Sequence, residues 1–174
     1  MLIAFDQALN TTGYAIFNND GSLVSYDKFT TQGLETEEKL KEIRDIVRKI
    51  ILENKATQIA IEEIQLQNIP GSTQHGNVVT FKKLAYVQAI ILELAFELEI
   101  PTRVIPSTTW KSYCKIKGRA RAEQKRNAQA FVLETYGVKA IQDICDSICI
   151  GRYVINNERG FCEEDGSNEL NWGE

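Results

Sequence analysis

Histidine, proline and paired cysteines are scarce in this sequence. Its 174 residues include one histidine, three prolines and four cysteines, and no two cysteines have the C-x-x-C spacing of a zinc site. Cys145 and Cys149 stand four residues apart in an apolar stretch, where we expect small buried hydrophobic side chains. A paired-cysteine zinc site is therefore not expected, and a redox or metal role for Cys145 and Cys149 is the alternative to simple packing.

Long apolar runs are also missing. The most apolar stretch, Leu84–Leu98, is interrupted by a glutamine and two glutamates, so it falls short of the ~20 apolar residues that a membrane span needs. The acidic residue Asp6 stands near the start with no basic leader before it, which argues against a secretory signal. We predict a soluble cytoplasmic protein with a single domain, because 174 residues with 43% hydrophobic content suit one core.

The net charge of -4 hides two segments of opposite sign. Residues 156–174 contain six acidic residues and one arginine, so we predict an acidic tail there, after a folded domain at residues 1–155. A basic segment with only one acidic residue lies just before the last helices. Its seven basic residues are Lys111, Lys115, Lys117, Arg119, Arg121, Lys125 and Arg126. We predict that this basic segment contacts nucleic-acid phosphates.

The spacing of hydrophobic residues predicts an α/β fold with a mixed five-stranded sheet flanked by helices. Three antiparallel strands are expected first, at Leu2–Phe5, Gly13–Phe17 and Leu23–Phe29, with a tight turn at Asn18–Gly21. The remaining expected elements are a helix capped by Thr36, a parallel strand at Gln58–Glu62, a connection at Asn68–Gly76, a helix at Val78–Glu99, a strand at Val104–Ile105, a short helix capped by Ser107, and helices at Arg121–Tyr136 and Ile141–Ile155.

Four acidic residues occupy positions that packing alone explains badly. Asp6 and Glu62 each end an expected strand, and ligands of α/β sheets gather at the carboxyl ends of strands. Asp143 and Asp146 stand three apart in an apolar helix and therefore share one face. Converging carboxylates with almost no histidine favour Mg²⁺ or Mn²⁺, and two such ions about 4 Å apart can hydrolyse a phosphodiester.

At three places the sequence resembles the RuvC-type Holliday-junction resolvases. Residues 3–16 (IAFDQALNTTGYAI) resemble the first strand and hairpin of that family, in which Gly-Tyr or Gly-Trp follows an aspartate by seven residues. Residues 59–63 (IAIEE) resemble the strand of the second carboxylate, and residues 143–148 (DICDSI) resemble the closing D-x-x-D-A-L helix. The resemblance spans residues 1 to about 155 and implies an RNase H-like fold.

The resemblance implies a homodimeric, metal-dependent endodeoxyribonuclease that nicks Holliday junctions and other branched DNA in recombination and repair. The implied catalytic metal ligands are Asp6, Glu62, Asp143 and Asp146, holding two Mg²⁺ or Mn²⁺ ions per active site. Glu63 remains an alternative to Glu62, because a one-residue shift on a strand turns the side chain to the opposite face. Lys111, and Lys125 or Arg126, resemble basic residues of the family that contact phosphates.

The sequence departs from the bacterial pattern at two places. Gln7 and Ala8 follow Asp6, where bacterial members usually have Asp-Pro-Gly. Gln65, three residues past the glutamate, stands where those members have an aromatic residue that wedges into the junction. The short viral members diverge in a similar way, so we expect a bacteriophage protein that acts in the cytoplasm of its bacterial host.

Two other functions fit parts of the pattern. A non-catalytic branched-DNA-binding protein would use the basic segment without assembling the carboxylates. An aspartate followed by glycine seven residues later also occurs in actin-like and sugar-kinase-type ATPases, but those need a second domain and a glycine-rich adenosine motif. The chain has no Gly-Gly pair. The apolar stripe between Val78 and Phe96 is wider than one sheet face requires, and we expect its excess to pack between two subunits.

Overall fold

The computed structural model describes residues 1–66 and 73–163. The expected connection at Asn68–Gly76 lies mostly outside these ranges, as does the tail from residue 164 onward. The described elements are β1 (Leu2–Asp6), β2 (Thr11–Phe17), β3 (Leu23–Thr30), α1 (Thr36–Glu53), β4 (Gln58–Glu62), α2 (Gln74–Glu97), β5 (Thr102–Ile105), α3 (Ser107–Tyr113), α4 (Arg121–Tyr136) and α5 (Gln142–Glu163).

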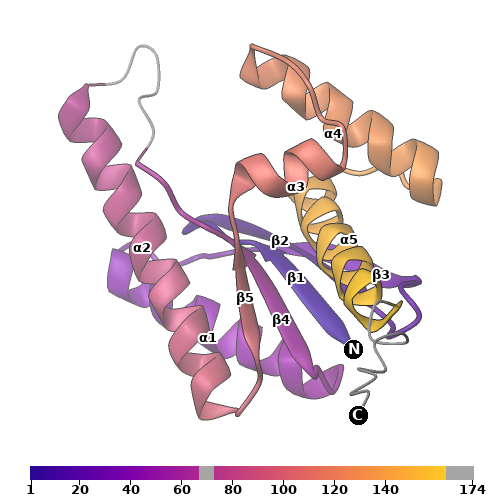
Figure 1. The fold of residues 1–174 in the computed structure, drawn as a ribbon. Helices are drawn as coiled ribbons and strands as arrows, with labels where there is room; N and C mark the ends of the chain where they lie inside the picture. Colours follow the sequence, from indigo (N-terminus) through magenta and orange to yellow (C-terminus); the bar gives the residue numbers. More distant parts are fainter. Residues whose placement is uncertain (67–72, 164–174) are drawn as a thin grey trace, which may run out of the picture.

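The strands form one mixed sheet in the order β3-β2-β1-β4-β5. β1 pairs antiparallel with β2 and parallel with β4, and β5 extends the parallel side. Helices α1 and α2 cover one face, and α5 covers the other with α3 and α4 beside it (Figure 1). The predicted α/β fold with a mixed five-stranded sheet is therefore confirmed.

Alternation along β1 and β4 divides the core into two layers. Ile3 and Phe5 pack in the layer beneath α1 and α2, whereas Leu2 and Ala4 pack in the layer beneath α5. Successive side chains of a strand point to opposite faces, so the strand-ending Asp6 continues the α5 side. The same parity places Glu62, two residues after Ala60, on the α5 side as well.

Small residues let α5 lie close to the sheet. The part of the sheet that lies beneath α5 contains three fully buried alanines, Ala4, Ala15 and Ala60. Gly13 lies opposite Asp6 on the neighbouring strand, and a Cβ atom there would stand 2.1 Å from the carbonyl oxygen of Asp143. The first turn of α5 therefore rests directly on the backbone of Gly13, beside the end of β1.

Three helix starts differ from the sequence expectation. Glu35, not Thr36, is the N-cap of α1, because Glu35 and Glu38 form a reciprocal capping box. The Thr73 hydroxyl caps α2 by accepting the Gly76 N–H, so that helix begins four residues earlier than expected. Pro106, rather than Ser107, is the N-cap of α3, and Ser107 is the first residue of the helix.

The remaining differences concern element lengths. The last strand begins at Thr102, two residues before the expected start, because its register with β4 already begins there. The last helix continues to Glu163, past the expected end at Ile155. The predicted turn at Asn18–Gly21 is present, with Gly21 at φ 81°. Cys145 and Cys149 are buried as expected. No helix within the described ranges combines the length and apolar character of a membrane span.

Candidate active site

A pocket of about 630 Å³ opens where the ends of β1 and β4 meet the first turns of α5. All four acidic residues singled out in the sequence line it: Asp6 from β1, Glu62 from β4, and Asp143 and Asp146 from α5. Residues separated by up to 140 positions are thus brought to one place by three elements. The i, i+3 spacing on α5 directs its two aspartates to the same wall of the pocket.

The carboxylates are close enough to perturb one another. Burial raises the pKa of Asp6 well above its usual value, and the negative charges of Asp146, Glu62 and Asp143 raise it further. The Lys111 ammonium acts in the opposite direction on the Asp6 pKa. Asp6 therefore lies within a crowded anionic group, and the Lys111 ammonium is near enough to lower its pKa.

Glu62 and Asp146 show the same pattern with different partners. Burial raises the pKa of Glu62, while the Lys111 charge and the Trp110 indole hydrogen bond lower it. Burial raises the pKa of Asp146 from 3.8 to about 6, and the hydrogen bond from Gln142 opposes this rise. Gln142 Nε2 donates to Asp146 Oδ2 at 3.0 Å. Both carboxylates would thus gain from a further positive charge.

The donor chemistry of the pocket fits a hard divalent cation. As the side chains stand, no three His, Cys, Asp or Glu residues in the described chain are grouped tightly enough to ligate one ion. The four carboxylates nevertheless supply only oxygen donors, which suit Mg²⁺ or Mn²⁺. A divalent cation among them would offset the mutual repulsion that raises the Asp6 pKa.

The structure separates the two adjacent glutamates. Glu62 lies on the α5 side, accepts a hydrogen bond from Trp110 Nε1 at 3.0 Å, and is coupled electrostatically to Asp6 and Asp146. Glu63 also borders the pocket, but its carboxylate accepts a hydrogen bond from Gln65 Nε2 at 3.3 Å. The geometry therefore groups Glu62, rather than Glu63, with the aspartates.

The basic segment contributes unevenly to the pocket. Lys111, Arg119, Arg121 and Lys125 line it, whereas the exposed Lys115, Lys117 and Arg126 are not among its lining residues. The Lys111 ammonium lies 5.1 Å from the centre of the Trp110 ring. Four of the seven predicted phosphate-binding residues thus share a pocket with the carboxylates, on the side formed by α3 and the start of α4.

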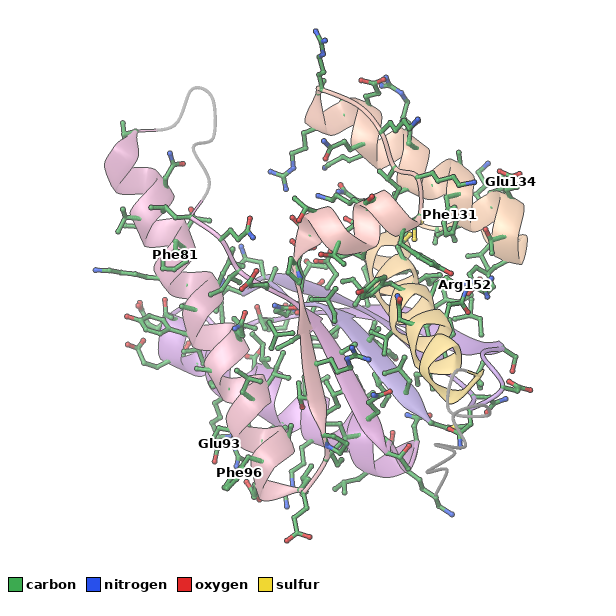
Figure 2. All side chains as sticks on the ribbon, in the orientation of Figure 1. Phe81, Glu93, Phe96, Phe131, Glu134 and Arg152 are labelled. Carbon is green, nitrogen blue, oxygen red and sulfur yellow. The ribbon has the colours of Figure 1, made fainter. Side chains whose placement is uncertain are left out.

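The opposite wall comes from α2, which the sequence did not connect with the acidic residues. Asn77, Thr80, Phe81 and Leu84 line the pocket from this helix. Figure 2 labels Phe81 on the half of α2 nearer to the pocket, with Phe96 toward the opposite end. Phe96 is 86% exposed, so the predicted apolar stripe is only partly buried within one subunit.

Sequence reasoning missed three polar neighbours of the carboxylates, namely Gln7, Trp110 and Gln142. Gln7 is 5% exposed and exchanges two hydrogen bonds with the backbone of Glu62. The sequence contained one signal for Gln7. It is a polar residue directly after a buried strand, at the position where the bacterial pattern has proline. No local pattern could have paired Trp110 with Glu62, because 48 residues separate them.

Comparisons with known proteins point to one family. A curated relative from Rickettsia bellii, described as crossover junction endodeoxyribonuclease RuvC, is 26% identical over 156 residues, covering 86% of this chain and 93% of the relative. The fold is similar to that of Thermus thermophilus RuvC, with a TM-score of 0.69, 17% identity, and coverage of 91% of this chain and 96% of that one.

Two further solved structures share the fold. Thermus thermophilus RuvC in complex with a Holliday junction substrate matches with a TM-score of 0.66 and 15% identity over 91% of this chain and 95% of that one. The yeast mitochondrial Holliday junction resolvase Ydc2 matches with a TM-score of 0.56 and 11% identity over 94% of this chain and 83% of that one. The family profile of crossover junction endodeoxyribonuclease RuvC matches residues 2–151, so the chain belongs to the RuvC family.

Proposed function

We propose that this protein is a structure-selective endonuclease that nicks Holliday junctions and other branched DNA by metal-assisted phosphodiester hydrolysis. One observation carries the proposal: in a RuvC-family chain, four carboxylates from β1, β4 and α5 line one pocket together with Lys111. Neither a structural ion pair nor a solvated surface accounts for several partly buried acidic groups that raise one another's pKa.

We assign Asp6, Glu62, Asp143 and Asp146 as the residues that hold the metal. Mg²⁺ or Mn²⁺, two ions per site, would supply Lewis-acid activation of a water and stabilisation of the leaving oxygen. The carboxylates of the chain bind and orient, and the raised pKa values of Asp6 and Asp146 mean that cation binding and deprotonation are coupled. Lys111, which lines the pocket, would attract the scissile phosphate toward the carboxylates.

The basic segment is the proposed DNA-binding surface. Lys111, Arg119, Arg121 and Lys125 would contact phosphates at the pocket, while Lys115, Lys117 and Arg126 would contact the flanking backbone. Residues 1–155 would form the nuclease domain and residues 156–174 the acidic tail, the first part of which continues α5 as far as Glu163. Symmetric cutting of a junction needs two sites, so we propose a homodimer that buries exposed apolar residues of α2 such as Tyr86 and Phe96.

The test is nicking of labelled four-way, three-way and linear duplex DNA with Mg²⁺, with Mn²⁺ and with EDTA. We expect symmetric nicks in the four-way junction, dependent on a divalent ion, and loss of nicking in Asp6→Asn. Junction binding without cleavage under every metal condition would instead identify a non-catalytic branched-DNA-binding protein. Parental nicking by Asp6→Asn would refute the proposed site.

A further inference from the structure

Glu62 is held from two sides by buried polar side chains that have no assigned role. We propose that Gln7 and Trp110 are positioning residues that fix Glu62 as a preoriented metal ligand. This inference rests on the proposed function, because it assumes that Glu62 meets a divalent ion. It concerns how this chain holds the carboxylate of Glu62. In the bacterial pattern the residue directly after the first aspartate is proline, whereas here it is Gln7.

Gln7 holds the backbone of Glu62. The parallel pairing of β1 with β4 ends at Phe5 and Ile61, so the next residues have no ladder partner across the two strands. Gln7 Nε2 donates to the Glu62 carbonyl at 2.5 Å, and the Glu62 N–H donates to Gln7 Oε1 at 3.1 Å. A side-chain amide carries both an acceptor oxygen and N–H donors, so Gln7 pairs with both backbone groups of Glu62 just beyond the last rung of the β1–β4 ladder.

Trp110 holds the carboxylate of Glu62. Its indole Nε1 donates to Glu62 Oε2 at 3.0 Å, and the ring is 1% exposed within the core layer beneath α5. A buried indole N–H needs an acceptor, and a hydrogen bond to a charged acceptor is stronger than one between neutral groups. Because the buried ring cannot turn without disturbing the core, its hydrogen bond to Oε2 restricts the rotation of the Glu62 side chain.

The pocket makes such positioning necessary. Glu62 and Asp6 line the same pocket, so their two negative charges repel each other. A free glutamate side chain at a strand end would relieve this repulsion by turning away toward solvent. The hydrogen bond from Trp110 to the carboxylate opposes that rotation, and the two hydrogen bonds from Gln7 fix the backbone from which the side chain projects. A ligand held by rigid neighbours loses less conformational freedom when the ion binds.

The experiment compares two variants with two matched controls in the full-length protein. Gln7→Met removes both amide hydrogen bonds at similar length, and Gln129→Met removes one amide hydrogen bond far from the pocket, to the Ala140 carbonyl. Trp110→Phe removes the indole N–H, and Tyr113→Phe on the same helix removes a hydroxyl that bonds Asn156 instead. Circular dichroism and thermal melting first establish which variants fold.

We expect Mn²⁺ affinity, measured by calorimetry without DNA, to fall about 10- to 100-fold in Gln7→Met and in Trp110→Phe, as is typical when residues that orient a metal ligand are removed. Single-turnover cleavage at fixed Mg²⁺ should fall by a similar factor, with junction affinity in EDTA unchanged. Higher Mg²⁺ should restore part of the rate. Both control variants should keep parental values in every assay.

The outcomes distinguish a failure of the positioning inference from a failure of the proposed nuclease function. Parental Mn²⁺ affinity in a folded Gln7→Met protein would overturn the positioning role of Gln7 whatever the nuclease assay shows, and the same result in Trp110→Phe would overturn that of Trp110. A parental protein that binds Mn²⁺ but cuts no branched DNA would refute the proposed function, with the Mn²⁺ titrations still deciding the role of both residues. A parental protein that binds no Mn²⁺ would overturn the positioning inference itself.

Discussion

The carboxylates of the pocket should destabilise the protein when no metal is present, and Asp146→Asn should reveal this. Asp146 is mostly buried near Asp143, and burial together with that neighbouring charge raises its pKa from 3.8 to about 6. The charged form is therefore less favourable in the folded protein than in the unfolded chain. Asparagine keeps an oxygen that can accept the Gln142 hydrogen bond but removes the charge.

The magnitude follows from the shift in pKa. One unit corresponds to 1.36 kcal/mol, so the rise from 3.8 to about 6 corresponds to roughly 3 kcal/mol of lost folding stability at pH values above the folded pKa. The destabilisation by Asp146 depends on pH. The neutral carboxyl form is present in both states below pH 3.8, and the destabilisation grows as the pH rises toward about 6 and is complete above it.

The assay is urea and thermal unfolding of both proteins in EDTA between pH 4 and pH 8. At pH 7.5 we expect Asp146→Asn to be more stable by up to about 3 kcal/mol, which for a chain of this size raises Tm by roughly 6–12 °C. Asp45→Asn is the control, because the Lys41 hydrogen bond lowers the pKa of the exposed Asp45 and no gain is expected there. Adding Mg²⁺ should stabilise the parental protein more than the variant.

Two results would refute this reasoning. If Asp146→Asn were less stable than the parental protein at pH 7.5 in EDTA, the carboxylate would be contributing favourable interactions rather than repulsion. If the stability difference were the same at pH 4 and at pH 7.5, it would not come from the ionisation of Asp146. In addition, if the stability gain of Asp146→Asn persisted unchanged in saturating Mg²⁺, the effect of Asp146 on stability would not depend on metal binding.

Three further predictions concern the same pocket. Gly13→Ala places a Cβ 2.1 Å from the Asp143 carbonyl oxygen, so we expect α5 to shift, Tm to fall and cleavage to drop at least about 100-fold while junction binding persists, as gel shifts and nicking assays would report. Glu62→Gln should abolish nicking, whereas Glu63→Gln should retain most of it; the reverse order in a single-turnover assay would exchange their roles. Lys111→Gln removes a charge that lowers the pKa of Glu62, so the acidic limb of the pH–rate profile should move to higher pH, and an unmoved limb would contradict this.

Much of the fold could be predicted from the local spacing of hydrophobic residues along the sequence. Buried apolar runs in strands and a repeating apolar face in helices depend on neighbouring residues, so β1, β4 and α4 could be predicted close to their observed ranges, whereas the end of α5 could not. Helix starts were less predictable. Glu35 competes with Thr36 as a cap through its pairing with Glu38, and the Thr73 cap lets α2 start early even though Gly76 follows.

The candidate ligands could be named from the sequence because each one ends a strand or shares a helix face with another. Asp6, Glu62, Asp143 and Asp146 are placed by rules that act over a few residues. Their convergence needed the packing of α5 against the sheet, which depends on Gly13 and on small residues distributed over three strands. No local rule contains that information.

The tertiary structure alone decided how the pocket is supported and charged. Gln7 and Trp110 reach Glu62 across 55 and 48 residues, and only some of the basic segment faces the carboxylates. Such contacts arise from chain elements that meet after folding, and side-chain hydrogen bonds of a few ångströms depend on the final packing. The scarcity of histidine and paired cysteine had already limited the chemistry to oxygen ligands, because the sequence alone determines which donor atoms are available. Folding decided which of those oxygen atoms lie near one another, because it brings distant residues of the chain into contact.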